Sequence, residues 1–317
     1  MKPRALVRAP MRGQAWNRLQ ELADIVYEPQ ARSASVMAAT ELAARLVRER
    51  ARILVTEADE VSGPVIDLPL LAIGCARAYP VNVDIAAATS RGVPVLCAPG
   101  YDADAVAELT LALLLAVTRR VAAADRAVRA GRVPCEPHRT WEIAGRTFGM
   151  VGLGAAGRAV AWRMAGLGMR VIAHDPRVPE ARHSLETVLA ESDVISLHPS
   201  GPLRLGLKEF RQMKPGAVFI NTAEPELCDL DALVGALRSG RLAGAGLDCL
   251  PQEWLIPGHR LTAVLADMDN VVLTPRIGGA TYDTEVNHTR MICGDIVRIL
   301  GGERPLHCAN PEVLDAK

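Results

Sequence analysis

Short apolar runs alternate along the chain with longer stretches whose apolar residues recur at helical spacing. In the first hundred residues the short runs predict strands at Ala5–Arg8, Ile53–Thr56, Leu70–Ile73 and Pro94–Cys97. The longer stretch Ala34–Arg50 has the spacing of a helix. Strands separated by helices are typical of βαβ units, in which neighbouring strands are parallel. This part of the chain is therefore expected to form an α/β domain.

A second alternation begins after residue 140 and predicts a second α/β unit. Its expected strands are Thr147–Val151, Arg170–Ala173, Val194–Leu197, Ala217–Asn221, Gly244–Asp248 and Val271–Thr274. Its expected helices are Ala156–Gly166, Leu185–Ala190 and Leu230–Arg238, and a last helix of the chain is expected at about Thr281–Leu300. Between the two series, Asp102–Ala130 is predicted as one long helix, which would suit a domain connection or a dimer contact.

Composition narrows the class of protein. The 317 residues suggest two domains, and 36 basic residues balance 36 acidic ones. This neutral total argues against a nucleic-acid or membrane-surface partner. The longest apolar run, Leu109–Val117, is about half the ~20 residues that a membrane span needs. Seven scattered cysteines suggest neither disulfides nor a metal site, and the N-terminus has no signal-peptide pattern. A cytoplasmic protein is expected.

The strongest motif is the glycine-rich segment Gly152-Leu-Gly-Ala-Ala-Gly157. It directly follows the apolar run Phe148–Val151 and opens an alanine-rich helix. Asp175 stands 18 residues after Gly157, at the end of the next expected strand. A glycine triplet alone could be an ordinary turn, but this context is the fingerprint of a dinucleotide-binding βαβ unit.

Each part of the fingerprint has a physical role. Gly152 permits the tight turn, Gly154 lets the backbone approach the pyrophosphate, and Gly157 allows close packing of helix on strand. The free N–H groups at the helix N-terminus face the phosphates. Asp175 can accept hydrogen bonds from the ribose hydroxyls and would repel a 2′-phosphate, which favours NAD, although Arg177 keeps NADP as an alternative.

Over nearly its whole length the sequence resembles the D-isomer-specific 2-hydroxyacid dehydrogenase family. The resemblance is carried by ordered motifs beside the glycine segment. They are Asn82–Asp84, Arg91–Val95, Ala98–Gly100, Ala105–Glu108, Ser196–His198, Met213–Ala217, Asn221–Ala223, Leu237–Gly244, Leu247–Asp248, Leu273–Pro275 and Ile277–Gly279.

The resemblance implies two Rossmann-like, doubly wound parallel-sheet domains with a cleft between them. Residues 1–98 and 290–317 would form the substrate domain, and 99–289 the NAD-binding domain. It implies a homodimer and a small-molecule substrate held partly by Arg77, Ala78 and Tyr79, where Gly-Gly usually stands at 78 and 79. Beside the fingerprint residues, it places Ala155, Ala156, His198, Thr222, Ala223, Asp248, Gly278 and Gly279 at the cofactor.

Members of this family transfer a hydride between a nicotinamide and C2 of a 2-keto or 2-hydroxy acid. An arginine holds the substrate, and a histidine paired with a glutamate exchanges the proton, because hydride delivery puts negative charge on the carbonyl oxygen. This chain departs at two of the three positions. It has Glu224 where the arginine is expected and Arg276 where the histidine is expected, while Glu253 is retained.

Three hypotheses follow from the two changes. In the first, the active site is rearranged: Arg276 binds the substrate, and Glu253 or Glu224 transfers the proton. Arginine is a poor acid near neutral pH, since its pKa exceeds ~12. Another acid is then needed, from His198, His259, Tyr79 or Tyr282.

In the second hypothesis Arg276 only forms ion pairs with Glu224 and Glu253, and the protein is an inactive NAD-binding regulator. In the third, bound NAD serves a non-reductase chemistry. Glu224 would repel a substrate carboxylate in the usual pose by ~4 kcal/mol at 4 Å and an effective dielectric constant near 20. We therefore expect an NAD-dependent oxidoreductase acting on a small polar carbonyl or hydroxy compound in an altered site.

Overall fold

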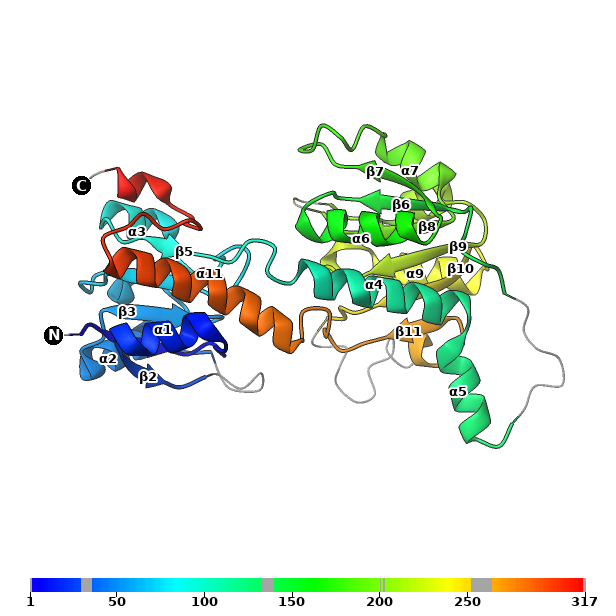
Figure 1. The fold of residues 1–317 in the computed structure, drawn as a ribbon. Coiled ribbons are helices and arrows are strands. Elements are labelled where there is room, and N and C mark those ends of the chain that lie inside the picture. Colours follow the sequence, from blue (N-terminus) through cyan, green and yellow to red (C-terminus); the bar gives the residue numbers. More distant parts are fainter. Residues whose placement is uncertain are drawn as a thin grey trace. The chain divides into compact units, whose positions relative to one another are not determined.

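The computed structural model describes residues 2–29, 36–132, 140–199, 201, 203–251 and 264–315. The chain divides into two compact units (Figure 1). Unit 1 comprises residues 1–101 and 282–317, and unit 2 comprises residues 102–281. The chain therefore passes between the units twice.

Unit 1 is a five-stranded parallel sheet in the order β2-β1-β3-β4-β5. Its strands are β1 Arg4–Val7, β2 Asp24–Tyr27, β3 Ile53–Thr56, β4 Ala72–Cys75 and β5 Val95–Leu96. Its helices are α1 Gln14–Leu22, α2 Ala39–Glu49, α3 Ile85–Ser90 and α11 Tyr282–Leu300, with short 3₁₀ turns at Gly63–Val65 and Pro311–Leu314.

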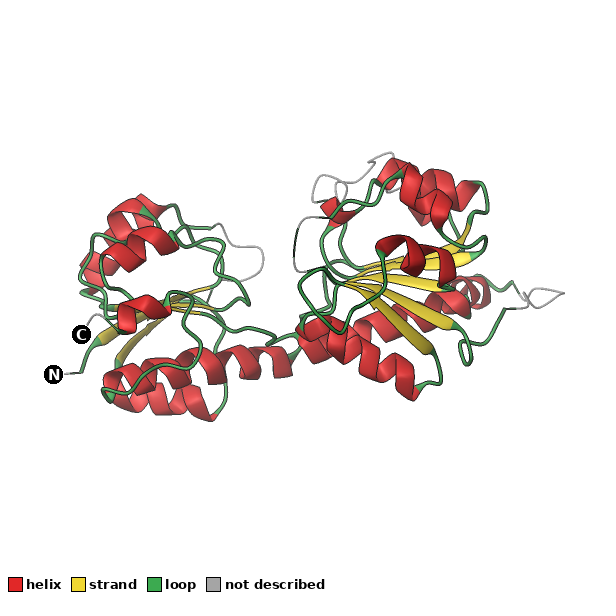
Figure 2. Ribbon diagram, turned by 90° about the horizontal axis from the view of Figure 1, so that it is seen from above, coloured by secondary structure: helices red, strands yellow, loops and turns green. Residues whose placement is uncertain are grey.

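Helices cover both faces of this sheet, as Figure 2 shows. Because side chains alternate between the two faces along a strand, each strand contributes residues to both buried clusters. Leu6 and Leu54 pack into one buried cluster with residues of α2. Ile53 and Val55 pack into the other, with residues of α1 and α11. A Cβ at Gly74 would lie 2.6 Å from Ile292 Cγ2. The glycine thus lets α11, from the end of the chain, lie directly on β4.

Unit 2 is a six-stranded parallel sheet in the order β11-β10-β9-β8-β6-β7. Its strands are β6 Thr147–Val151, β7 Arg170–His174, β8 Val194–Leu197, β9 Ala217–Asn221, β10 Leu242–Leu247 and β11 Val271–Leu273. Its helices are α4 Ala103–Thr118, α5 Val121–Arg129, α6 Ala155–Gly166, α7 Leu185–Glu191, α8 Leu207–Gln212 and α9 Leu230–Arg238, with a 3₁₀ turn, η2, at Pro225–Leu227.

The strand order of unit 2 reverses between β6 and β8. The chain moves from β6 outward to β7 and then returns to build β8 on the other side of β6. In open parallel sheets, ligands bind at the carboxyl ends of the strands at such a reversal. One buried cluster packs β6 and β9 residues against α4 and α6, and the other packs the opposite face against α7, α8 and α9. The two-domain parallel α/β fold is thus confirmed.

The single helix predicted over Asp102–Ala130 is wrong. Helix α4 ends at Thr118, Arg120 adopts a left-handed conformation with φ of 52°, and α5 starts at Val121. The physical reason lies in packing, because α4 buries residues throughout its length whereas α5 buries none. Local sequence favours helix in both halves, so only the change of surroundings separates them.

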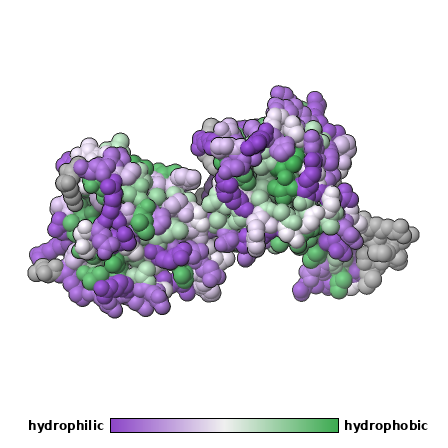
Figure 3. Space-filling model, turned by 45° about the horizontal axis from the view of Figure 1, so that its top comes forward, coloured by the Kyte–Doolittle hydropathy of each residue, from purple (hydrophilic) through white to green (hydrophobic). Residues whose placement is uncertain are grey.

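The surface agrees with the balanced composition. Hydrophilic residues cover much of the visible face of each unit, with smaller hydrophobic patches between them (Figure 3). Within the described residues, no helix is both long and apolar enough to span a membrane.

Candidate active site

The glycine-rich turn at the end of β6 is built so that no side chain fits there. Gly152 has φ of 103°, and a Cβ on it would lie 1.9 Å from the backbone oxygen of His198. A Cβ on Gly157 would lie 2.7 Å from the oxygen of Gly152. The turn therefore passes directly beneath the end of β8, at the reversal of strand order, and leads into α6.

The start of α6 suits an anion. Gly154 is its N-cap residue, no side chain caps the helix, and its first turn contains no acidic residue. Ala155 and Ala156 add only methyl groups beside the free N–H groups. A dinucleotide pyrophosphate fits this cradle, because the helix terminus offers donors and partial positive charge without a competing carboxylate.

Asp175 follows β7 and ties the glycine turn to the next loop. Its carboxylate is buried and accepts hydrogen bonds from the backbone N–H groups of Leu153 and Arg177, both at 2.9 Å. It also lines a cavity of about 230 Å³. The cavity is walled by Val151, Gly152, His174, Asp175, Pro176, Arg177, Pro199, Gly201 and Leu203.

The cavity lies where the adenosine end of a dinucleotide would follow from the pyrophosphate cradle. A carboxylate oxygen can accept more than one hydrogen bond, so Asp175 retains capacity for ribose hydroxyls. Arg177 lies against Gly201 on the same wall, since a Cβ there would lie 2.6 Å from the Arg177 Nη2. The residue raised as an alternative NADP determinant is therefore adjacent to Asp175.

His198 follows β8 and is buried. Its Nε2 lies 2.9 Å from Ser196 Oγ, and its backbone N–H donates to Val151 O at 2.7 Å. Burial lowers the pKa of His198 to about 4. The imidazole is therefore neutral near pH 7, which argues against the proton-donor role that was open for it.

Asp248 organises the loop after β11. One carboxylate oxygen accepts from Thr274 Oγ1 at 2.6 Å and from the N–H of Ile277 at 2.9 Å. The other accepts from the N–H of Gly278 at 2.8 Å. The Asp248 side chain is therefore committed to holding residues 274–278, and Arg276 stands at the centre of this clamp.

The same clamp fixes the backbone of Arg276. Its N–H donates to Asp248 O at 2.7 Å, and its φ is 57°, in the left-handed region. On the neighbouring strand, the Asn221 side chain donates to Glu224 O at 3.0 Å and accepts from the N–H of Ala223 at 3.0 Å. Both loops are thus shaped by buried polar residues at the carboxyl ends of β9 and β10.

Glu224 and Arg276, the two residues that depart from the pattern expected from the resemblance, meet. Arg276 Nη2 lies 2.7 Å from Glu224 Oε1, with 66% and 54% of the two side chains exposed. Burial lowers the pKa of Arg276, but the surrounding groups together, led by the Glu224 carboxylate, hold it above its ordinary value. Arg276 therefore keeps its charge and cannot serve as a proton donor.

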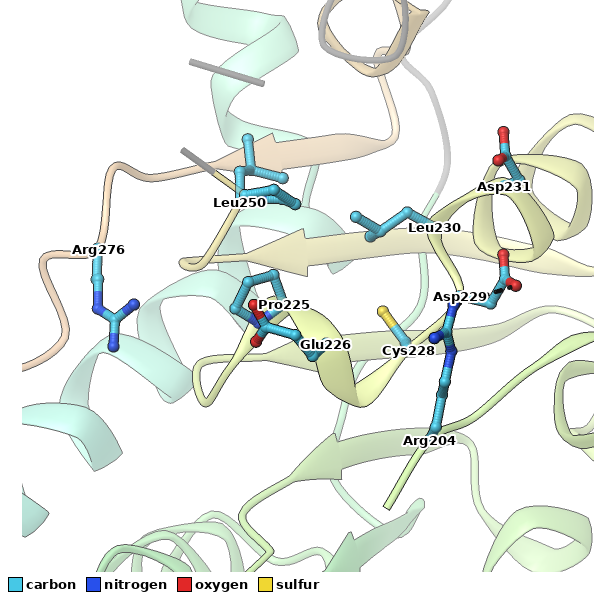
Figure 4. A pocket seen from close by; sticks show the side chains of 10 residues that line it. Arg204, Pro225, Glu226, Cys228, Asp229, Leu230, Asp231, Leu250 and Arg276 are labelled. Atoms are coloured by element: carbon cyan, nitrogen blue, oxygen red, sulfur yellow. Dashed lines mark ion pairs between the residues drawn. The ribbon is translucent and has the colours of Figure 1, made fainter. Parts of the chain in front are cut away.

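Arg276 also borders a cavity of about 560 Å³ at this edge of unit 2. Figure 4 shows Arg276 at one end and Arg204, paired with Asp229 at 3.6 Å, at the other. The remaining lining residues are Pro225, Glu226, Cys228, Leu230, Asp231, Leu250 and Pro251.

The other predicted site residues are dispersed. In unit 1, Arg77 donates from Nε to Glu57 O at 2.6 Å, Ala78 is half-buried and Tyr79 is 71% exposed. Glu253 and His259 lie outside the described residues. Gly279 packs near Asp102, with a Cβ position 3.5 Å from the Asp102 Cβ.

One residue of this region was not anticipated. Thr110 is fully buried in α4, and its Oγ1 lies 3.0 Å from Thr222 Oγ1. It fixes the loop after β9 to the helix beneath. The signal was present in the sequence, because Thr110 interrupts the most apolar run of the chain. Within the described residues, no group of three or more His, Cys, Asp or Glu side chains could hold a metal ion.

Comparison with known proteins agrees with this geometry. Residues 111–278 match the model of the D-isomer specific 2-hydroxyacid dehydrogenase NAD-binding domain. A glyoxylate reductase of Thermofilum pendens is 36% identical over 296 residues, which is 86% of this chain and 85% of the relative.

Two solved structures are also similar. A D-isomer specific 2-hydroxyacid dehydrogenase from Polaromonas sp. JS6 66 has a TM-score of 0.84 and 28% identity, over 97% of this chain and 99% of that one. An acyclic imino acid reductase in complex with NADPH and D-Arg has a TM-score of 0.79 and 26% identity, over 96% and 99%. With unit 2 as its NAD-binding domain, this chain belongs to the D-isomer specific 2-hydroxyacid dehydrogenase family.

Proposed function

We propose that the protein is an NAD-dependent oxidoreductase acting on a small polar carbonyl or hydroxy compound, with Glu224 and Arg276 at the substrate. One observation carries the proposal. The dinucleotide cradle is intact around Gly152, while the ion pair of the two altered residues is exposed at the carboxyl ends of strands in the same sheet. The constrained glycine turn supports binding of a dinucleotide, and the exposed ion pair in the same sheet supports chemistry on a polar molecule.

When bound, NAD(H) supplies or accepts the hydride. The residues of the chain hold it in the proposed arrangement, with the α6 N-terminus at the pyrophosphate and Asp175 at the adenosine ribose. Thr222, Ala223, Gly278 and Gly279 would border the nicotinamide end. This assignment is supported by the clamp of Asp248 on Gly278, which fixes that loop in place.

At the substrate, Arg276 supplies a permanent cation and Glu224 an anion. The proton-transfer group cannot be Arg276, and the burial of His198 disfavours that residue. Glu253 remains the predicted acid–base group, and Arg77, Ala78 and Tyr79 remain predicted substrate contacts of unit 1. The alternatives are an NAD-binding regulator without turnover and an NAD-using chemistry other than reduction.

NADH oxidation against a panel of small carbonyl compounds tests the proposal. We expect turnover with some member and its loss in Arg276→Ala and Glu253→Gln. Glu191→Gln is the matched control, because Arg170–Glu191 is a comparably exposed ion pair, at 2.6 Å, elsewhere in unit 2. Binding of NADH by calorimetry without any turnover would favour the regulator. If the protein did not bind NADH, the proposal and both alternatives would be refuted.

We also propose a homodimer, as the family resemblance implies. Helix α5 supports it, because it buries no residue while Val121 and Val128 are 54% and 65% exposed. Light scattering should give twice the chain mass, and Val121→Glu with Val128→Glu should halve it; a monomeric parent protein would refute the dimer. A cytoplasmic location and the lack of a nucleic-acid partner stay predictions from composition.

A further inference from the structure

The substrate end of unit 2 pairs an anion with a cation in one place. Glu224 and Arg276 are 2.7 Å apart, and each side chain is more than half exposed. Nη2 is the only guanidinium nitrogen of Arg276 with a partner among the described residues. The pair therefore offers a free carboxylate edge and free guanidinium donors to a molecule that arrives from solvent.

This arrangement is poorly suited to reduction of a ketone. When a hydride adds to a carbonyl carbon, the C=O π pair moves to oxygen, which becomes an alkoxide and needs a proton donor and nearby positive charge. Among the described residues, Glu224 opposes that charge, Arg276 cannot donate a proton, and the Cys249 thiol is a poor acid because burial raises its pKa to about 12. Glu253, the predicted acid–base group, lies outside the described residues.

A protonated imine reverses these requirements. The iminium nitrogen already carries its proton and a positive charge before the hydride arrives. When the hydride pair adds to carbon, the C=N π pair moves to nitrogen and gives a neutral amine, while NADH becomes NAD⁺. The amine then takes one proton from water. No acid is needed in the hydride step, and a carboxylate beside the nitrogen favours the protonated form that accepts the hydride.

We propose that the substrate class is the 2-imino acid, an iminium nitrogen and a carboxylate on adjacent carbons. Glu224 binds the iminium and Arg276 binds the carboxylate, so the two residues that depart from the family pattern together form one substrate-binding site. Such compounds form when a 2-keto acid condenses with ammonia or a primary amine. The inference rests on the proposed hydride transfer and replaces the carbonyl compound by the imine that forms from it.

The test compares one acid with and without an amine. Purified protein with NADH is given pyruvate alone and pyruvate with methylamine at mildly alkaline pH, and N-methylalanine is measured with NADH oxidation. We expect at least tenfold higher kcat/KM with the amine present. Glu224→Gln should abolish this preference, and Glu191→Gln, in the matched surface pair, should retain it.

A binding measurement separates recognition from turnover. With NAD⁺ present, calorimetry should show N-methylalanine binding at least tenfold more tightly than lactate, and Glu224→Gln should remove the difference. Equal or faster reduction of pyruvate without amine would overturn the inference and leave the proposed oxidoreductase standing. No turnover with either mixture, together with no preference for the amino acid, would overturn both.

Discussion

Replacing Gly152 by alanine isolates the contribution of the glycine turn to cofactor binding. The residue has φ of 103°, and its Cβ would lie 1.9 Å from His198 O and 2.6 Å from Pro199 Cα. Both neighbours are backbone atoms, so neither can rotate away. The turn or the end of β8 must move, and the α6 N-terminus moves with it.

The cost can be worked from these two effects. Holding an L-residue in a left-handed backbone conformation costs roughly 1–2 kcal/mol, and forcing an extra carbon into a packed site costs roughly 1–3 kcal/mol. Unit 2 should therefore lose roughly 2–5 kcal/mol of unfolding free energy. NADH should also bind at least about tenfold more weakly, a loss of about 1.4 kcal/mol.

Gly166→Ala is the matched control on the same helix. Gly166 ends α6, its φ is not positive, and a Cβ there meets no atom within 4 Å. The same change of residue should leave NADH affinity unaltered and stabilise by up to ~1 kcal/mol. Urea unfolding and fluorescence titration with NADH give both quantities. If Gly152→Ala matched the control in stability and affinity, the close approach of β8 to the turn would be disproved.

Three further outcomes are expected. Asp59 is fully buried against Arg8, at 2.7 Å; although burial raises its pKa, hydrogen bonds led by that of Arg8 hold it below the usual value. Unit 1 should lose stability as pH falls through that pKa, and Asp59→Asn should cost about 3–5 kcal/mol in urea unfolding at neutral pH; a cost under 1 kcal/mol would contradict the buried pairing. Burial lowers the pKa of His198 to about 4, and unfolded histidine titrates near ~6.5. The unfolded state therefore binds the proton first, and the unfolding free energy of unit 2 should fall between about pH 6.5 and 4. His198→Asn should reduce this slope, and an unchanged slope would show that another group causes it. Arg276→Ala breaks an exposed pair with Glu224, so the free energy of unfolding should change by no more than ~1 kcal/mol. Over the same substitution kcat/KM should fall at least tenfold. A loss of stability that parallels the loss of activity would show a structural role instead.

Much of the fold could be predicted because its central strands are buried on both faces. The runs Ile53–Thr56, Thr147–Val151, Val194–Leu197 and Ala217–Asn221 are observed at the predicted bounds, and every residue in them is buried. By contrast β2, at Asp24–Tyr27, was not predicted. It pairs with β1 alone at the edge of its sheet and buries none of its residues fully. Its apolar run, Ile25–Tyr27, is only three residues long and lies between Asp24 and Glu28.

The candidate site could be predicted only in part, for a reason of register. Glu224 and Arg276 are 52 residues apart in sequence. They meet because Leu247 on β10 pairs with Asn221 on β9 and with Leu273 on β11. The identity of each residue is visible in the sequence, and the family resemblance predicts that both positions are altered. Their contact, and the Asp248 clamp that presents Arg276, depend on how three strands align.

The observed pairing does not by itself favour an inactive protein. An ion pair that withdrew Arg276 from chemistry would have to be strong, as a buried pair with further hydrogen bonds can be. This one is exposed on both sides, and such pairs contribute only ~0–1 kcal/mol. An arriving carboxylate or iminium can therefore exchange with either partner at little cost. The exposure of the pair is therefore compatible with the proposed function, in which the two groups hold each other in position until a substrate of matching charge replaces their mutual contact.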